Sequence, residues 1–228
     1  MRYALYFTPA QDDPLTVAAA RWLGRDAFSG GLVAQGEEAP LSLETLREAT
    51  AEPRRYGFHA TLKAPFALAD GASPAGLIDA MAAFAAETRI FDIPALSLGR
   101  IGAFFALVPG APCPPLREFA ADCVRRFEPF RAPLAEADIA RRRPERLTPA
   151  QREHLAVWGY PYVMDEFRFH MTLSGPLEPA LADAVEPVLK SRFAGFLGKP
   201  LPVSGLALFV EPERGAPFTV HTWLPLAA

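Results

Sequence analysis

Residues 56–66 read Tyr-Gly-Phe-His-Ala-Thr-Leu-Lys-Ala-Pro-Phe, and residues 167–177 read Phe-Arg-Phe-His-Met-Thr-Leu-Ser-Gly-Pro-Leu. The two stretches align when His59 is placed over His170. Each then has a phenylalanine before a His-x-Thr motif, a leucine directly after the motif and a proline three residues beyond that leucine. The chain therefore carries one short pattern twice, and the rest of the sequence can be read outward from these two copies.

Both copies have the pattern of a β-strand. Apolar and polar residues alternate and a proline ends the run, which is typical of a strand that stops at a turn. Because successive side chains on a strand point to opposite faces, His59, Thr61 and Lys63 are expected to share one face. In the second copy the same alternation selects four side chains: Arg168, His170, Thr172 and Ser174.

The elements expected around the two motifs recur in the same order: a strand, a helix, a variable insert, the motif strand and a second helix. In the first copy these are a strand at 2–8, a helix at 14–24, a mixed segment at 25–53 with a short helix at 42–50, the motif strand and a helix at 74–89. In the second they are a strand at 103–108, a helix at 114–128, an irregular insert at 129–165, the motif strand and a helix at 178–192. A strand at 93–98 follows the first copy, and strands at 203–211 and 218–224 close the chain. A repeat this long indicates a duplicated lobe and not a solenoid array.

We therefore expect an α+β fold in which residues 1–228 form a single bilobal domain with pseudo-repeats of roughly 1–100 and 101–228. Two mostly antiparallel sheets would face a central cleft, with helices on the outside and a pseudo-two-fold axis between the lobes. Each lobe alone would leave the sheet face that bears its His-x-Thr pair uncovered. The two pairs are expected to meet in the cleft.

Composition narrows the class of protein. A chain of 228 residues with a formal net charge of −3 and a pI near 5.9 has no excess of positive charge for binding long nucleic acids, although a few local cations suffice for a small anion. The only cysteines, Cys113 and Cys123, fit free thiols in a reducing compartment. No apolar run approaches membrane-spanning length, and the start of the chain lacks the pattern of a signal peptide. We expect a cytoplasmic protein with no membrane partner.

Two facing imidazoles suit a reaction that needs one general base and one general acid, because an unperturbed histidine titrates near pH ~6.5. A phosphodiester fits this pair best: one histidine takes a proton from the attacking hydroxyl or water, and the other returns a proton to the leaving oxygen. The hydroxyls of Thr61 and Thr172 can donate to the phosphoryl oxygens that gain charge. The reaction requires neither a metal ion nor a cofactor. The purely structural alternative is that both are core histidines held by nearby hydroxyls. It has to explain why the His-x-Thr motif occurs at matching places in both copies.

Three further side chains are candidates for substrate binding. Lys63 and Arg168 share the motif face by parity and could neutralise an anionic group. Tyr6 could form an aromatic wall if the N-terminal strand lies beside the first motif strand. The basic cluster at 141–146 is either a solvated insert or a lid that reaches a negatively charged substrate.

The paired motifs resemble those of the 2H phosphoesterase superfamily. The opening Arg-Tyr-Ala-Leu-Tyr-Phe at 2–7, the block at 56–63 and Phe-His-Met-Thr-Leu-Ser-Gly-Pro at 169–176 are similar to a branch associated with bacterial phosphonate-utilisation operons. The resemblance covers nearly the whole chain. It implies a metal-independent phosphoesterase that acts on a cyclic phosphate or another small phosphodiester. By the same resemblance, the catalytic tetrad would consist of His59, Thr61, His170 and Thr172.

Other functions remain open at this point. The enzyme could process RNA ends that carry a 2′,3′-cyclic phosphate or a 2′-5′ linkage, with an oligonucleotide end as its partner. The cleft could instead bind a phosphorylated metabolite without turnover. A metal hydrolase is disfavoured because the histidines show no His-x-His or His-x₃-His spacing. The sequence does not assign the acid and base roles to particular histidines, nor an oligomeric state.

Overall fold

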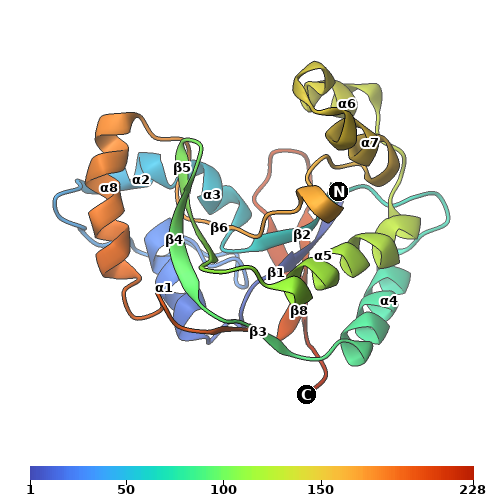
Figure 1. Cartoon of the computed structure of the whole chain (residues 1–228), viewed down its shortest axis with the longest axis horizontal. Helices are drawn as coiled ribbons and strands as arrows, with labels where there is room; N and C mark the ends of the chain where they lie inside the picture. The colour runs from blue at the N-terminus through green and yellow to red at the C-terminus, as the bar shows by residue number, and fades with distance from the viewer.

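The computed structural model describes all 228 residues, and it confirms the α+β class (Figure 1). The strands are β1 (Arg2–Phe7), β2 (Ala60–Phe66), β3 (Phe91–Ile93), β4 (Leu96–Ile101), β5 (Phe104–Pro109), β6 (Met171–Thr172), β7 (Leu201–Val203), β8 (Gly205–Glu211) and β9 (Thr219–Pro225). The α-helices are α1 (Pro14–Leu23), α2 (Leu43–Ala49), α3 (Ala51–Tyr56), α4 (Pro74–Glu87), α5 (Pro114–Phe127), α6 (Glu136–Arg141), α7 (Pro149–Trp158) and α8 (Pro179–Arg192). Short 3₁₀ turns lie at Glu128–Phe130, Pro144–Arg146 and Met164–Glu166.

Seven strands form one antiparallel sheet in the order β4-β5-β6-β2-β1-β8-β9, and β3 pairs with β7 in a separate two-stranded sheet. The two motif strands are neighbours, with Ala60 of β2 opposite Met171 of β6. The two motifs were expected on separate sheets that face each other across a cleft, and this part of the expectation is wrong because both lie in one sheet. Each motif strand would be an unpaired edge in a lone lobe, and joining them satisfies backbone groups that would otherwise stay open.

The strand order is nearly symmetric about the contact between β6 and β2. Each motif strand is flanked by the strand that opens its repeat, β1 beside β2 and β5 beside β6. The strands do not respect a boundary near residue 100, however, because β8 and β9 from the end of the chain extend the half that contains β1. The pseudo-repeats of 1–100 and 101–228 thus stay a prediction about the sequence, and they do not correspond to two separable halves of the sheet.

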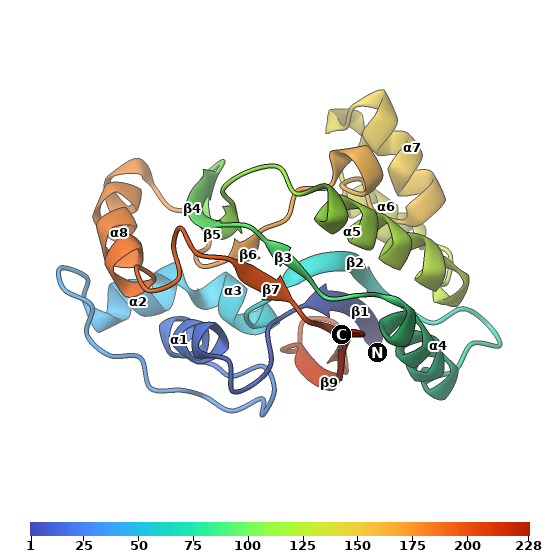
Figure 2. The same ribbon diagram turned by 60° about the horizontal axis from the view of Figure 1, so that its bottom comes forward.

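The halves also exchange helices. Helix α1 follows β1, yet its Trp22 Nε1–H donates to the carbonyl of Leu173 at 2.7 Å, beyond the second motif. Helix α5 follows β5, yet it packs against β2. Figures 1 and 2 show the result: α4 and α5 lie together on one side of the molecule, and α1 and α8 lie on the other. One core of 43 buried residues runs under both sides and joins them.

Side-chain parity separates this core from the opposite face of the sheet. On β1, Tyr3, Leu5 and Phe7 belong to the large core, whereas Ala4 and Tyr6 belong to a smaller apolar cluster on the other face. The apolar positions of both motifs also point into the large core, as expected: Phe58, Ala60, Leu62, Phe169, Met171 and Leu173. The polar positions of the motifs are therefore left for the other face.

Two segments differ from the expectation. The insert at 129–165 is not irregular, because it holds α6 and α7 and stands beyond α5 at one end of the molecule (Figure 1). Helix α7 begins with a capping box, in which the Thr148 side chain accepts from the Gln151 amide and the Gln151 side chain accepts from the Thr148 amide. The second motif strand is also shorter than expected, since only Met171–Thr172 joins the ladder. None of the helices combines the length and the apolar composition that a membrane-spanning segment requires.

Candidate active site

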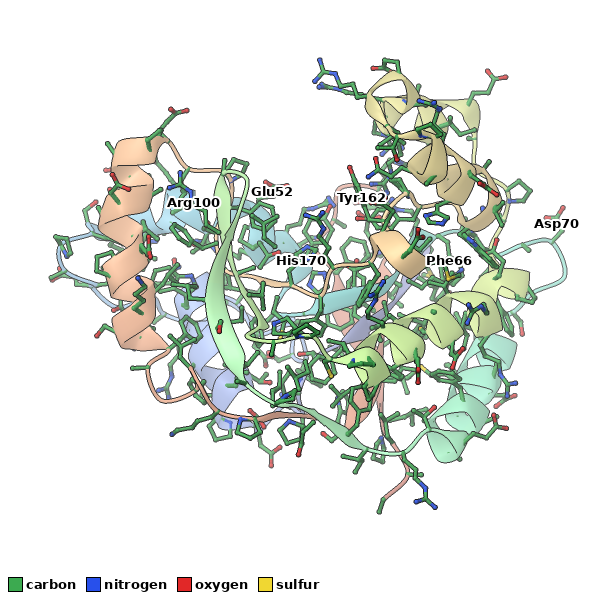
Figure 3. All side chains as sticks on the ribbon, viewed as in Figure 1. Glu52, Phe66, Asp70, Arg100, Tyr162 and His170 are labelled. Carbon is green, nitrogen blue, oxygen red and sulfur yellow. The ribbon has the colours of Figure 1, made fainter.

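A cavity of about 860 Å³ lies on the face of the sheet opposite the large core, and it brings the two motifs together. His59, Thr61, His170 and Thr172 all line it. Helix α3 contributes Glu52 to one side of its wall, and α6 contributes side chains from the insert. In Figure 3 His170 lies near the centre of the molecule, between the sides marked by Glu52 and Phe66, which both line the same cavity.

The first histidine is held by the turn that ends α3. Gly57 there has φ +78°, and a Cβ at this position would overlap the Cβ of Ala27, so the tight approach requires glycine. The Gly57 carbonyl lies 2.9 Å from Nδ1 of His59. A carbonyl can only accept, so Nδ1 carries the proton and Nε2 of the neutral ring is left as an acceptor. Nε2 lies 3.4 Å from the Thr61 hydroxyl, on the cavity side.

The second histidine is held in the same way. Nδ1 of His170 lies 2.8 Å from the carbonyl of Arg168, so this ring also donates through Nδ1 and keeps Nε2 free. The Phe104 ring, with its centroid 5.9 Å from that of the imidazole, flanks it. Both rings therefore have the tautomer and the anchoring that a general acid or base acting through Nε2 needs.

Aromatic rings surround His59 more closely than His170. Tyr6 stacks on the His59 imidazole with centroids 3.9 Å apart, and the rings of Phe209 and Tyr56 lie 5.9 and 6.0 Å away. Burial among these rings lowers the pKa of His59 to about 4, and the nearby positive charge of a protonated His170 adds to this, while the hydrogen bond to Gly57 opposes it. His59 is consequently neutral at pH 7.

This shift predicts a direct titration result. The ring protons of His59, assigned in NMR spectra by comparison with His59→Gln, are expected to titrate near pH 4. In Tyr6→Leu, which lets water reach the ring, the midpoint is expected to rise toward ~6.5. A wild-type midpoint between 6 and 7 would contradict the desolvation argument. Because the folded pKa lies below the unfolded one, the contribution of His59 to stability is full above pH ~6.5 and is lost as pH falls through about 4.

Lys63 does not lie in the cavity, and the parity argument for it is wrong. Tyr6 pairs with Thr61 and Leu5 pairs with Lys63, so β2 has one extra residue between these pairs, a β-bulge. The bulge turns Lys63 to the face of the sheet that α5 covers, where its side chain is 3% exposed. Its Nζ binds the Glu128 carboxylate at 2.7 Å and the Val124 carbonyl at 3.3 Å. Burial lowers the pKa of this amine, and the pairing with Glu128 opposes that shift.

The other two substrate-binding candidates have different outcomes. Tyr6 lies on the strand next to β2 and lines the cavity, as the sequence suggested. The side chain of Arg168 is exposed and is absent from the cavity wall, so it does not face the motif residues as its parity predicted. Arg168 precedes β6 and is not paired in the sheet, so strand alternation does not fix the direction of its side chain. Arg168 contributes to the site through its carbonyl, which anchors His170.

Sequence reasoning missed most of the positive charge in the cavity. Five arginines line it: Arg2, Arg55, Arg141, Arg142 and Arg214. Only two carboxylates, those of Glu52 and Asp138, line it with them. The parity of β1 places Arg2 on the same face as Tyr6, so strand alternation could have selected it. The basic cluster of the insert did indicate Arg141 and Arg142. No local pattern singles out the remaining two. The structure has no group of three or more His, Cys, Asp or Glu side chains arranged to hold a metal ion.

Comparison with known proteins adds a family to this geometry. Residues 61–219 match the family model described as "Protein of unknown function (DUF1045)". The chain belongs to the DUF1045 family. This DUF1045 chain is also similar to two proteins named ribose 1,5-bisphosphate phosphokinase PhnN. It is 37% identical to that of Janthinobacterium sp. (strain Marseille) over 230 residues, which cover 99% of this chain and 51% of that protein. It is 34% identical to that of Laribacter hongkongensis (strain HLHK9) over 239 residues, which cover 100% of this chain and 53% of that protein. The chain thus spans about half the length of the curated relatives it matches.

Two solved structures resemble the DUF1045 chain along its whole length at low identity. One is described as a crystal structure of a phosphoesterase, with 12% identity, a TM-score of 0.43 and coverage of 100% of this chain and 98% of that one. The other is LigT of E. coli complexed with 3′-AMP, with 13% identity, a TM-score of 0.42 and the same coverage.

Proposed function

We propose that this chain is a metal-independent phosphoesterase that acts on a small phosphodiester or cyclic phosphate. One observation carries the proposal: two imidazoles, each anchored through Nδ1 to a backbone carbonyl, line one cavity together with two threonine side chains. The arginines in the wall favour an anionic substrate. The resemblance of the paired motifs to 2H phosphoesterases supports the same chemistry.

The different environments of the two histidines support different roles for them in the proposed reaction. His59, whose pKa is lowered to about 4, is neutral and can take a proton from water through Nε2 as the water oxygen attacks phosphorus. His170, in the form that carries a second proton on Nε2, donates that proton to the ester oxygen that leaves as the old P–O bond breaks. The Thr61 and Thr172 hydroxyls donate to the non-bridging oxygens, which gain charge in the transition state. The proton gained by His59 and the one lost by His170 return through solvent.

A link to phosphonate utilisation is part of the proposal. It rests on the similarity to proteins named PhnN and on the motif blocks of the phosphonate-associated branch. The kinase activity in that name belongs to proteins about twice as long, and we propose no kinase activity for these 228 residues. The cytoplasmic location and the lack of a cofactor stay predictions from the sequence.

Turnover of a cyclic-phosphate panel by the purified protein in EDTA tests the function. The panel holds 2′,3′-cyclic nucleotides, short RNAs that end in a cyclic phosphate, and ribose 1,2-cyclic phosphates. Hydrolysis of at least one small member, unchanged by the chelator, is the expected result. Preference for the RNAs would reassign the enzyme to RNA-end processing. Binding without turnover would make the cavity a receptor, and turnover abolished by EDTA would contradict a metal-independent mechanism.

A further inference from the structure

Two of the cavity arginines converge on a carboxylate that is completely buried. Glu211, at the end of β8, is 0% exposed. Its Oε2 accepts from Nε of Arg2 at 2.6 Å, and its Oε1 accepts from the Gly215 amide at 3.0 Å. Nη1 of Arg55 lies 3.5 Å from the same Oε1. Burial works to raise the pKa of Glu211, but the bonds from Arg2 and Gly215 outweigh it and the pKa lies below its ordinary value.

One carboxylate cannot neutralise two guanidinium groups. Arg2 and the Gly215 amide already satisfy both oxygens of Glu211 at good hydrogen-bond distances. Arg55 sits at the outer limit of that distance, so most of its charge is left uncompensated. Arg2 and Arg55 both line the cavity, and their side chains keep 21% and 29% of their surface exposed. Glu211 therefore fixes two cations in the wall and leaves a net positive charge there.

These cations lie near His59, and aromatic rings stand between them and its imidazole. The Arg55 guanidinium stacks over the Tyr56 ring at 4.5 Å, and the Tyr56 ring lies 6.0 Å from that of His59. The rings of Phe218 and Tyr56 stack with their centroids 5.2 Å apart. The guanidinium carbon of Arg2 lies over the Phe218 ring, 5.9 Å from its centroid. One aromatic ring, that of Tyr56, therefore lies between Arg55 and His59, and two rings, those of Phe218 and Tyr56, lie between Arg2 and His59. A ring-sized group such as a sugar could bridge the two positions.

We propose that Arg2 and Arg55 form a second anion site that binds a phosphomonoester on the substrate, apart from the phosphodiester that reacts at the histidines. This inference rests on the proposed function, since it names the class of substrate: a sugar that carries both a cyclic phosphodiester and a phosphomonoester. Guanidinium groups suit a phosphomonoester because their paired donors match its oxygens. The overall charge of the chain is −3, so this positive wall is a local feature.

Matched substrates test the proposal. The pairs are ribose 1,2-cyclic phosphate with and without a 5-phosphate, and 2′,3′-cyclic AMP with and without a 5′-phosphate. The wild type is expected to favour the phosphorylated member of at least one pair by about tenfold or more in kcat/KM, the value of one charge-assisted bond. In Arg55→Gln this ratio is expected to fall at least fivefold, and Arg55→Lys should restore part of it. Because the readout is a ratio, a general loss of activity cancels.

Arg100→Gln is the matched control, because Arg100 is exposed on β4 and lies outside the cavity wall. It removes the same charge and should leave the ratio unchanged. A wild-type ratio near one for both pairs, or an equal ratio in Arg55→Gln and wild type, would overturn the anion site.

A binding experiment separates failure of the anion site from failure of the proposed function. Calorimetric titration with adenosine 5′-monophosphate is expected to show binding that Arg55→Gln weakens about tenfold and His59→Ala weakens less than about twofold. If no cyclic phosphate turns over and this pattern still holds, the anion site stands and the phosphoesterase does not. If His59→Ala weakens binding and Arg55→Gln does not, or if no binding is seen, the assignment of Arg2 and Arg55 is wrong.

Discussion

His59→Ala and His170→Ala are each expected to lower kcat/KM by about 10²–10⁴-fold on the panel substrate that turns over. Each removes a proton carrier whose Nε2 faces the cavity and whose ring is already oriented by a backbone carbonyl. Because both histidines serve the same step of the proposed reaction, the double variant should lose little more than either single variant. The fourth variant, His221→Ala, is the control, because His221 is exposed on β9 and bonds to the Thr222 hydroxyl outside the cavity. Its activity should equal that of the wild type.

The acid and base roles can be separated with the leaving group. A phosphodiester of 4-nitrophenol needs no proton on its leaving oxygen. With this substrate, His170→Ala should therefore keep most of the wild-type rate. The same substrate should not recover the rate in His59→Ala, which still lacks the base that activates water. Recovery in His59→Ala alone would reverse the assignment. Full activity in both variants would show that the two histidines are core residues and not catalytic ones.

The repeated motif was the most informative part of the sequence, because strand parity depends only on local geometry. It placed His59 and Thr61 on one face and Phe58 and Leu62 on the other, as the structure has them. The sequence also predicts the helices with clear starts to within a few residues, such as α4, which begins at Pro74. Hydrophobic period and capping residues fix these features within a short window, so they can be seen without knowing the fold.

Features that depend on distant partners could not be predicted. Pairing of β8 with β1 joins residues some two hundred positions apart, and no local pattern marks it. Arg55 and Arg214 reach the cavity only because α3 and the turn after β8 are brought there by the rest of the fold. The bulge between Thr61 and Lys63 is a further case, since it arises from the register of β2 against β1 and reverses the parity of the residues that follow, so that Ala64 lines the cavity and Lys63 does not.

Glu128→Ala is expected to destabilise the protein by about 3 kcal/mol, because it leaves a buried ammonium without a counter-ion. Glu128 binds Lys63 through Oε2 at 2.7 Å and Arg131 through Oε1 at 2.6 Å. Without it, Lys63 keeps only the Val124 carbonyl at 3.3 Å. Loss of a proton by Lys63, whose pKa burial already lowers, would relieve part of the penalty, which is why we expect the lower end of the ~3–5 kcal/mol range for broken buried pairs.

Lys63→Met should cost far less, about 1 kcal/mol or below, because the two ends of the pair are unequal. Glu128 keeps its bonds to Arg131 and is 23% exposed, so losing Lys63 does not strand it. Methionine fills similar space beside the Phe66 ring, which lies 5.7 Å from the Lys63 amine. Denaturant unfolding of both variants measures the difference. Lys63→Met should also retain turnover, because the bulge in β2 directs this side chain away from the substrate. A large loss of turnover in a stably folded Lys63→Met would instead mean that the lysine reaches the cavity, as its parity alone suggested.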